Sequence, residues 1–417
     1  MIFAASLNKT LIHQRKLKVF NDPVYGSIGI PNDFILQLIA HPFFQRLRRI
    51  SQMGFSYLSY PGAHHTRFHH ALGAMHLMTK AITTLRYKGI EITLKEENAL
   101  LTAILLHDIG HGPFSHALEE ILIPKIHHET LSLKFMNELN CLFNGEIEMA
   151  ISIFTGKYSK KFLSALVSSQ LDIDRLDYLK RDSFFSGVAE GNINSERLIT
   201  TMNVLDDHIV IEEKGIHSIE KFLMARRFMY WQVYLHKTSV VAELMLKNVI
   251  KRARFLIQKR PNFMTGSVVG EFLRQKIEMN HQDFLTKFAQ LDDTDIIILL
   301  KSWIYDSDSI LAYLSKGLIH RNLLDIQFYD KAPSADDYLN ILKKVAKSFK
   351  INTLDAEFLV YQGVLTNTAY EQNKVPISIL KRNGEVVEFL TLSKFSSNSG
   401  FTDQHQRYYI CFPKSIV

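Results

Sequence analysis

Cysteine is scarce in this chain of 417 residues: Cys141 and Cys411 are its only two, and they lie far apart with no CxxC spacing. A disulfide framework is therefore not expected, which agrees with a reducing cytosol. Long apolar runs are also missing, since no stretch approaches the roughly 18 consecutive apolar residues of a membrane span. At the N-terminus apolar residues precede the charges, the reverse of a secretory signal. We expect a cytoplasmic protein without a membrane segment.

The chain has few prolines and no low-complexity run, so its composition is ordinary for a globular protein. Its 49 basic and 42 acidic residues give a formal charge of +7. Two explanations stay open: a solvated surface that leans positive, or basic groups gathered in one cleft that attract phosphates. A nucleic-acid partner is compatible with the charge but unsupported, because no dense Lys/Arg stripe is interleaved with aromatics. The 18 histidines supply groups for metal binding and proton transfer.

Apolar residues at helical spacing predict a mainly α fold. The expected helices include 67–87, 95–107, 128–140, one continuous helix over 160–182 and another over 217–258. The helix over 95–107 is the most apolar of them. We expect it to be central and buried.

Short β-hairpins are predicted in two places. One is expected over 207–215, and another surrounds Asn383-Gly384, a dipeptide that favours tight hairpin turns. A last strand over 407–412 is expected to join the second hairpin. These patterns divide the chain into a large helical domain over 1–315 and a smaller α+β lobe over 316–417.

A histidine-aspartate pair, His107-Asp108, ends the most apolar helix. A carboxylate in this place is costly unless it is paired or coordinated. A structural pair that caps the helix end is one explanation. A metal site is the other, because His70 lies upstream in RFHH and Asp174 lies downstream in DIDRLDY. Two imidazoles and two carboxylates can bind a divalent ion and leave positions for water or substrate.

Three motifs, RFHH, HDIGHGPFSH and DIDRLDYLKRD, resemble matching motifs of the HD superfamily. More narrowly, they are similar to the branch that contains the SAM-and-HD-domain deoxynucleoside triphosphate triphosphohydrolases. KVFNDPVYG, FQRLRRISQMG, YPGAHHTRF and YLHK agree with that branch. The resemblance covers roughly residues 16–260 and fades through the C-terminal third. It implies an HD-domain helical core without a SAM domain, since the motifs begin almost at the N-terminus.

The resemblance implies catalytic roles for the residues that match the motifs. The metal ligands would be His70, His107, Asp108 and Asp174, holding Fe, Mn, Zn, Mg, Ni or Co. His111 and His116 correspond to histidines beside the substrate's phosphates, where an imidazole can stabilise charge or protonate a leaving oxygen. His128 matches a further active-site histidine. Glu119 stands where relatives have an acid that can orient a catalytic histidine.

Three arginines match the triphosphate clamps of the family: Arg67, Arg175 and Arg226. A guanidinium offers paired donors to phosphate oxygens. Arg175 replaces a lysine of close relatives, which keeps the charge and changes the geometry. For Arg226 a solvated helix face is an equally good explanation.

The nucleoside site is also implied by matching positions. Tyr178 and Asp182 match residues that meet the sugar, where a tyrosine beneath C2′ would exclude a 2′-hydroxyl. Gln52 and Tyr234 match residues that line the nucleoside, although core packing is the alternative for Tyr234. Leu235 replaces a glutamine near the base, so base preference does not transfer.

The resemblance also implies an allosteric nucleotide site. The matching residues are Lys18, Val19, Asn21, Gln45 and Arg48. Ala40 replaces the acid that reads guanine in relatives. The family implies a homo-oligomer, dimer or tetramer, in which a nucleotide effector would bind at a subunit contact.

The leading hypothesis is metal-dependent hydrolysis of a deoxynucleoside triphosphate to deoxynucleoside and inorganic triphosphate. A second is an HD phosphohydrolase acting on another nucleotide or on a nucleic-acid end. The stringent-response hydrolases commonly carry a Glu-Asp pair after His-Asp, and that pair is missing here. A third is a nucleotide-binding regulator that has kept the fold, against which the presence of all four expected ligands argues.

Overall fold

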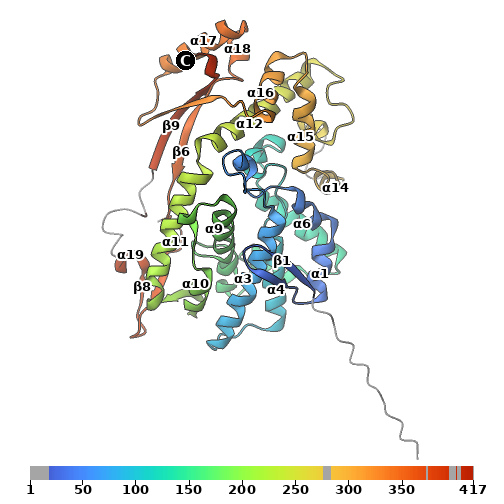
Figure 1. Ribbon diagram of the computed structural model, residues 1–417. Coiled ribbons are helices and arrows are strands. Elements are labelled where there is room, and N and C mark those ends of the chain that lie inside the picture. The colour runs from blue at the N-terminus through green and yellow to red at the C-terminus, as the bar shows by residue number, and fades with distance from the viewer. Residues whose placement is uncertain (1–17, 276–282, 372–373, 394–400, 402–404, 417) are drawn as a thin grey trace, which may run out of the picture.

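The computed structural model describes residues 18–416 apart from 276–282, 372–373, 394–400 and 402–404. The described part is mainly helical, as predicted. α17 (Ala335–Phe349) and α18 (Thr353–Ala356) lie with β6 (Tyr361–Asn367) and β9 (His405–Phe412) at one end of the molecule, whereas β8 (Val386–Glu388) and α19 (Phe389–Leu392) lie beside α11 (Ile216–Met229) (Figure 1). None of the described helices combines the length and the apolar content that crossing a membrane requires.

The centre of the helical body consists of α3 (Arg67–Tyr87), α4 (Leu94–Leu106) and α9 (Ile173–Ser186). α3 packs against both α4 and α9. α4 begins with a capping box in which Thr93 and Glu96 satisfy each other's backbone N–H groups. Residues 100–106 are all buried, as expected for the most apolar helix. His107 follows directly, so the His-Asp pair stands at a buried helix end.

Shorter helices surround these three. In the first half of the chain they are α1 (Asp33–Ala40), α2 (Pro42–Gln45), α5 (Glu119–Leu122), α6 (His128–Leu142), α7 (Glu148–Phe154) and α10 (Ser195–Thr201), with 3-10 turns η1 (Arg46–Arg49), η2 (Gly54–Leu58), η3 (Ser115–Ala117) and η4 (Ala189–Gly191). In the second half they are η5 (Glu213–Gly215), α13 (Val268–Leu273), α14 (Phe284–Phe288), α15 (Asp293–Trp303), α16 (Ser309–Ile319), α17 (Ala335–Phe349), α18 (Thr353–Ala356), α19 (Phe389–Leu392) and η8 (Lys414–Ile416). Their apolar faces share one hydrophobic core.

The continuous helix expected over 160–182 is wrong. The chain instead forms α8 (Lys161–Val167) and, after a break, α9. The break occurs because the Asp172 carboxylate caps α9 by accepting N–H bonds from Arg175 (2.8 Å) and from Ser169 (2.7 Å).

The helix expected over 217–258 is also interrupted. It divides into α11 (Ile216–Met229), a π-helical turn η6 (Tyr230–Tyr234) and α12 (Lys237–Lys259). The His236 side chain accepts the N–H of Thr238 (3.2 Å) and so starts α12 afresh. Such π-helical turns are frequent at functional sites.

The predicted hairpins form, one of them shifted. β1 (Val19–Asp22) and β2 (Gly26–Gly29) pair near the N-terminus. The hairpin expected over 207–215 instead pairs β3 (Met202–Leu205) with β4 (His208–Glu212), because Asp206 and Asp207 adopt left-handed backbone angles and form the turn. The hairpin of β7 (Ser378–Leu380) and β8 (Val386–Glu388) is confirmed. β7 pairs with β4 in parallel, which joins the two hairpins into one sheet.

The last strand does not join that sheet, contrary to the prediction. β9 (His405–Phe412) lies between β5 (Asp325–Tyr329) and β6 (Tyr361–Asn367) in a separate antiparallel sheet (Figure 1). Chain proximity favoured the hairpin, but the longer β6 and β5 offer β9 a partner on each edge.

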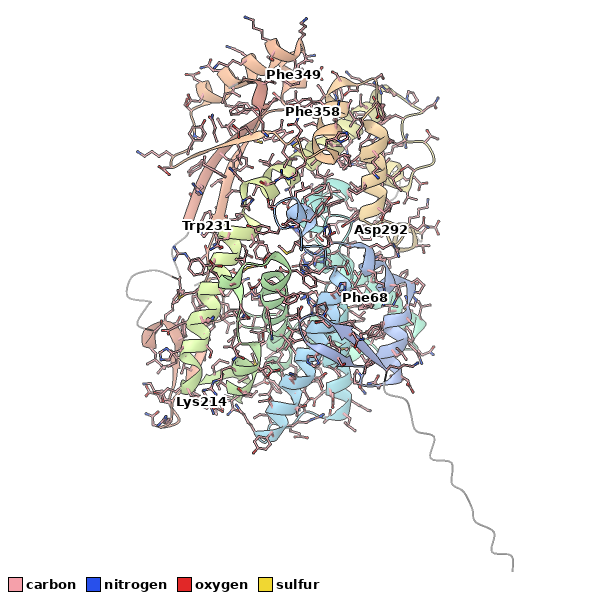
Figure 2. All side chains as sticks on the ribbon, viewed as in Figure 1. Phe68, Lys214, Trp231, Asp292, Phe349 and Phe358 are labelled. Carbon is pink, nitrogen blue, oxygen red and sulfur yellow. The ribbon has the colours of Figure 1, made fainter. Side chains whose placement is uncertain are left out.

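Besides the pairing of β7 with β4, the C-terminal part of the chain contacts the body through α12. Phe255 packs against Phe358 with ring centroids 5.9 Å apart, and Arg252 forms ion pairs with Asp308 (2.7 Å) and with Asp355. Figure 2 labels Phe358 in this lobe, well away from Phe68 at the start of α3. The predicted boundary at residue 315 falls within α16 and stays a prediction.

Candidate metal centre

The four expected metal ligands lie together where α3, α4 and α9 meet. His70 and His107 face each other through their Nε2 atoms at 3.4 Å. Asp174 Oδ1 lies 3.1 Å from His70 Nε2 and 3.4 Å from His107 Nε2. Asp108 completes the group, with Oδ1 3.5 Å from His107 Nε2. His70, His107 and Asp174 are close enough for a single ion to contact, and Asp108 also lies within reach of His111 and His128.

The second ring nitrogen, Nδ1, of each histidine already has a hydrogen-bond partner. His70 Nδ1–H donates to Asp177 Oδ2 (2.7 Å), and His107 Nδ1–H donates to the carbonyl of Ile104 (2.7 Å). Each bond directs the Nε2 lone pair inward, as second-layer partners do for metal-bound histidines. The donor chemistry therefore fits a divalent metal ion.

The electrostatics of the cluster also favour a cation. Burial opposes protonation of His70, but its hydrogen bonds to Asp174 and Asp177 outweigh burial and raise its pKa to about 10. Burial likewise opposes ionisation of Asp174, yet hydrogen bonds from His107 and His70 hold its pKa well below the ordinary value. Buried carboxylates thus draw positive charge to this point, and a divalent ion supplies it without protonating the histidines.

A second layer of charge supports His70, and sequence reasoning missed it. Arg181 is wholly buried and pairs with Asp177 (2.9 Å) and with Asp22 of β1 (2.7 Å). Burial opposes ionisation of Asp177, but Arg181 and His70 outweigh burial and lower its pKa to about 2. A Cβ on Gly73 would lie 2.1 Å from both side chains, so this position of α3 requires glycine. The i,i+4 spacing of Asp177 and Arg181 was the available signal.

A pair of stacked imidazoles adjoins the metal ligands. His111 and His128 lie with ring centroids 3.9 Å apart, and His111 Nδ1 is 3.4 Å from Asp108 Oδ1. Glu119 Oε1 lies 2.9 Å from His128 Nδ1, so this acid orients a histidine as its match in relatives implied. The side chain of His116, predicted to lie here, is outside the described residues.

Arg67, at the first position of α3, is buried against the cluster. It forms an ion pair with Asp108, and its Nε–H donates to Ser115 Oγ (2.7 Å). Gln52 lies on the neighbouring loop, where its N–H donates to the carbonyl of His65 (3.0 Å). Its buried Oε1 accepts no hydrogen bond from the described residues.

An acid outside the recognised motifs accepts hydrogen bonds from two segments of the site, the loop at Ser51 and the turn at Phe114. Asp293, at the start of α15, accepts the N–H of Ser51 (2.8 Å) and of Phe114 (2.7 Å). Phe114 and Ser115 both adopt left-handed backbone angles, with φ of 51° and 41°, which are strained for non-glycine residues. The neighbouring Asp292 is labelled in Figure 2. Asp293 therefore stabilises the turn that presents Ser115 to Arg67.

The residues expected to meet the sugar form a hydrogen-bonded group. Asp182 accepts from Tyr234 Oη (2.7 Å) and lies 2.6 Å from His65 Nε2. Tyr178 links this group to the metal ligands, with its ring centroid 6.5 Å from that of His70 and 6.4 Å from that of Tyr234. Burial raises the pKa of both tyrosines, which keeps their hydroxyls protonated. Sequence analysis had given no role to the buried His65.

The other two predicted clamps lie on the side of the C-terminal lobe. Arg175 is folded back on Asp172 and the carbonyl of Ser169. Arg226 is buried, so the solvated-face alternative is wrong. A cavity of about 820 Å³ is lined by Arg175, by Lys161 and Lys374, and by apolar side chains of β4 and β7.

The residues expected to bind an allosteric nucleotide lie on the surface near β1. Lys18, Val19 and Asn21 are exposed. Gln45 accepts a hydrogen bond from Arg48 Nε (2.9 Å), and the Arg48 guanidinium lies 3.6 Å from the ring centroid of Phe68. Val19 and Asn21 belong to β1 and Lys18 precedes it, whereas Gln45 ends α2 and Arg48 lies in η1.

A helical fold with a candidate His/Asp metal site is typical of the HD phosphohydrolases, and known proteins agree. The HD domain family model matches residues 67–182, and the HD associated region matches 193–260. A phosphohydrolase of known structure from Bacteroides thetaiotaomicron is 42% identical, over 96% of this chain and 100% of that one, with a TM-score of 0.92.

Two further relatives extend the comparison. YwfO of Bacillus subtilis is 30% identical, over 96% of this chain and 93% of YwfO. The Dictyostelium discoideum homolog of the deoxynucleoside triphosphate triphosphohydrolase SAMHD1 is 32% identical, over 83% of this chain and 75% of the homolog. The chain belongs to the HD-domain phosphohydrolases that carry an HD-associated region.

Proposed function

We propose that the protein hydrolyses deoxynucleoside triphosphates to deoxynucleoside and inorganic triphosphate. One observation carries the proposal: the His/Asp cluster adjoins an arginine, a stacked histidine pair and two tyrosines at the distances given above. The named activity of the Dictyostelium relative supports it.

Each group has a role in this reaction. His70, His107, Asp108 and Asp174 would hold a divalent ion, which when bound polarises phosphate and lowers the pKa of water. Arg67 neutralises charge on the triphosphate. His128, oriented by Glu119, would donate a proton to the leaving oxygen, and His111 would lie beside it. His116 is assigned to the phosphates by resemblance alone.

The nucleoside would lie over the tyrosines. Tyr178 would pack beneath C2′ and exclude a 2′-hydroxyl, while Asp182 and Tyr234 would bind the sugar and Gln52 the nucleoside. Arg175 and Arg226 would bind the far end of the triphosphate. We further propose a homo-oligomer with a nucleotide effector near Lys18, Val19, Asn21, Gln45 and Arg48.

A panel of dNTPs and NTPs, singly and in pairs, tests the proposal with Mn, Mg, Fe or Co present. We expect free deoxynucleoside and inorganic triphosphate from at least one dNTP, and no nucleoside from NTPs. A His107→Ala/Asp108→Ala variant should release neither product. Absence of deoxynucleoside from every dNTP and every mixture would contradict the proposal. Cleavage of another phosphoester by the same preparation would favour the alternative phosphohydrolase, and a cellular function kept by the double variant would favour a regulator.

A further inference from the structure

A carboxylate of the C-terminal lobe is placed on a predicted triphosphate clamp. Glu371 Oε1 lies 3.5 Å from Arg226 Nη2, and Arg226 Nη1 donates to the carbonyl of Ala369 (2.9 Å). Arg226 is buried on α11, so its positive charge has few possible partners. The acid therefore occupies a position where an anionic ligand would bind.

The same carboxylate acts on the second clamp. Burial opposes ionisation of Glu371, but Lys374, then Arg226 and Arg175, lower its pKa, so the group is negatively charged near neutral pH. Lys374 lies 3.0 Å from it. Glu371 thus sits within the combined field of three basic side chains.

Both arginines keep an unused donor. Among the described residues, the Nε–H groups of Arg175 and Arg226 are buried and have no hydrogen-bond partner. The Glu371 carboxylate offers only two acceptor oxygens, whereas a triphosphate offers many. The present contacts therefore leave some arginine donors without an acceptor. Burial of a donor without an acceptor is unfavourable, which favours a larger anion.

The position of Glu371 is built into the fold. Its backbone N–H donates to Gln170 Oε1 (2.9 Å), and Gln170 Nε2 donates to the carbonyl of Val375 (2.9 Å). Gln170 is buried in the break between α8 and α9. The adjacent Tyr370 is buried, and its hydroxyl accepts the N–H of Ile377 (3.1 Å). These contacts fix the backbone of Glu371 and its neighbours, and so place its side chain beside the arginines.

We propose that Glu371 is an internal competitor for the phosphate-binding arginines, so that the C-terminal lobe sets the affinity of the active site for triphosphate. The inference rests on the proposed function, because it takes Arg226 and Arg175 as triphosphate ligands. A triphosphate must displace the carboxylate or bind beside it against charge repulsion, and either route weakens binding. The competition weakens as salt screens the charges.

Calorimetric titration with inorganic triphosphate tests the inference without turnover, using the metal-loaded full chain. Glu371→Gln keeps the shape and removes the charge, and should bind triphosphate roughly threefold to tenfold more tightly than wild type. Glu371→Ala should change affinity in the same direction. Glu385→Gln is the matched control, because Glu385 is an exposed carboxylate whose charge partner is Lys381 (3.0 Å) rather than an arginine, and it should leave affinity unchanged.

Three outcomes would overturn the inference: unchanged affinity in both Glu371 variants, weaker binding in both, or no binding of triphosphate to any of the proteins. A gain that persists undiminished in high salt would also contradict a charge effect. In dNTP assays KM should fall with kcat nearly unchanged, a division that a merely structural role would not produce. If the variants bind triphosphate more tightly but no dNTP is hydrolysed, the proposed reaction is wrong and this inference stands. If hydrolysis is normal but triphosphate affinity is unchanged, this inference is wrong and the proposed reaction stands.

Discussion

The two halves of the candidate site are built differently. The Nδ1 atoms of His70 and His107 both have a partner, and these partners come from α9 and α4. Around Arg175 and Arg226 donors stay unpaired among the described residues, and one anchor, Glu371, comes from the C-terminal lobe. The metal half is therefore organised in advance, whereas the arginine half is shaped by a distant part of the chain.

The largest effect is expected from removing the support of the metal half. Asp177→Asn replaces the carboxylate that accepts the His70 Nδ1–H bond with a neutral amide. It also removes one ion-pair partner of Arg181. Loss of such a second-layer carboxylate typically costs about 10-fold to 100-fold in metal affinity. Titration with Mn²⁺ measures the metal affinity, and the bound metal content and the activity are determined on the same samples. Asp336→Asn, at an exposed acid of α17, is the control. Unchanged affinity in Asp177→Asn would show that His70 needs no such partner.

A smaller effect is expected at Asp293, which serves the metal half from outside the matched family regions. Asp293→Asn leaves one of the N–H groups of Ser51 and Phe114 facing an amide, and so releases the strained turn beside Arg67. We expect kcat/KM to fall roughly tenfold, because small displacements of positioned groups cost rate steeply.

A neighbouring variant separates this effect from loss of helix stability. Asp295→Asn weakens the capping box of α15 without touching either loop. It should lower the melting temperature and keep kcat/KM. An equal loss of kcat/KM in both variants would refute a positioning role for Asp293.

The smallest effect concerns stability alone and lies at an acid, Glu243, whose pKa is governed by burial rather than by charged partners. Burial raises the pKa of Glu243 on α12 from 4.5 to about 7, and Lys247 offsets it only in part. A pKa above the unfolded value means that the neutral acid stabilises the fold below about pH 4.5, and that this contribution is lost as pH rises through 7.

Replacing Glu243 with a neutral residue should therefore stabilise the fold mainly at high pH. Glu243→Gln should raise the free energy of unfolding by roughly 1–2 kcal/mol at pH 8.5, and by much less at pH 5. Denaturant unfolding at the two pH values measures this. Exposed Glu357→Gln is the control, and equal gains at both pH values would contradict the titration.

Much of the metal half could be predicted from the sequence. The helix over 67–87 has the predicted bounds, and His70, His107 and Asp174 lie together, with Asp108 beside His107. Such ligands sit in short local patterns, next to helix ends whose apolar spacing is visible in the chain.

Other features were out of reach because no local pattern encodes them. The break before α9 depends on one Asp172 side chain competing for backbone N–H groups within an otherwise helical pattern. The placement of β9 between β5 and β6 depends on pairings across nearly 90 residues, with β5 at Asp325 and β9 ending at Phe412. Local propensity is similar for either partner, so tertiary packing decides.

The sequence by itself determined the helical class and the hairpin at Asn383-Gly384, because these follow from periodicity and turn chemistry, and its resemblance to the HD superfamily predicted which histidines and aspartates would hold a metal. Only the tertiary structure decided which charges face one another: Arg181 between Asp177 and Asp22, Asp293 beneath two loops, and Glu371 on Arg226. Electrostatic partners are set by distance in space, and those distances exist only once the helices and the lobe have packed.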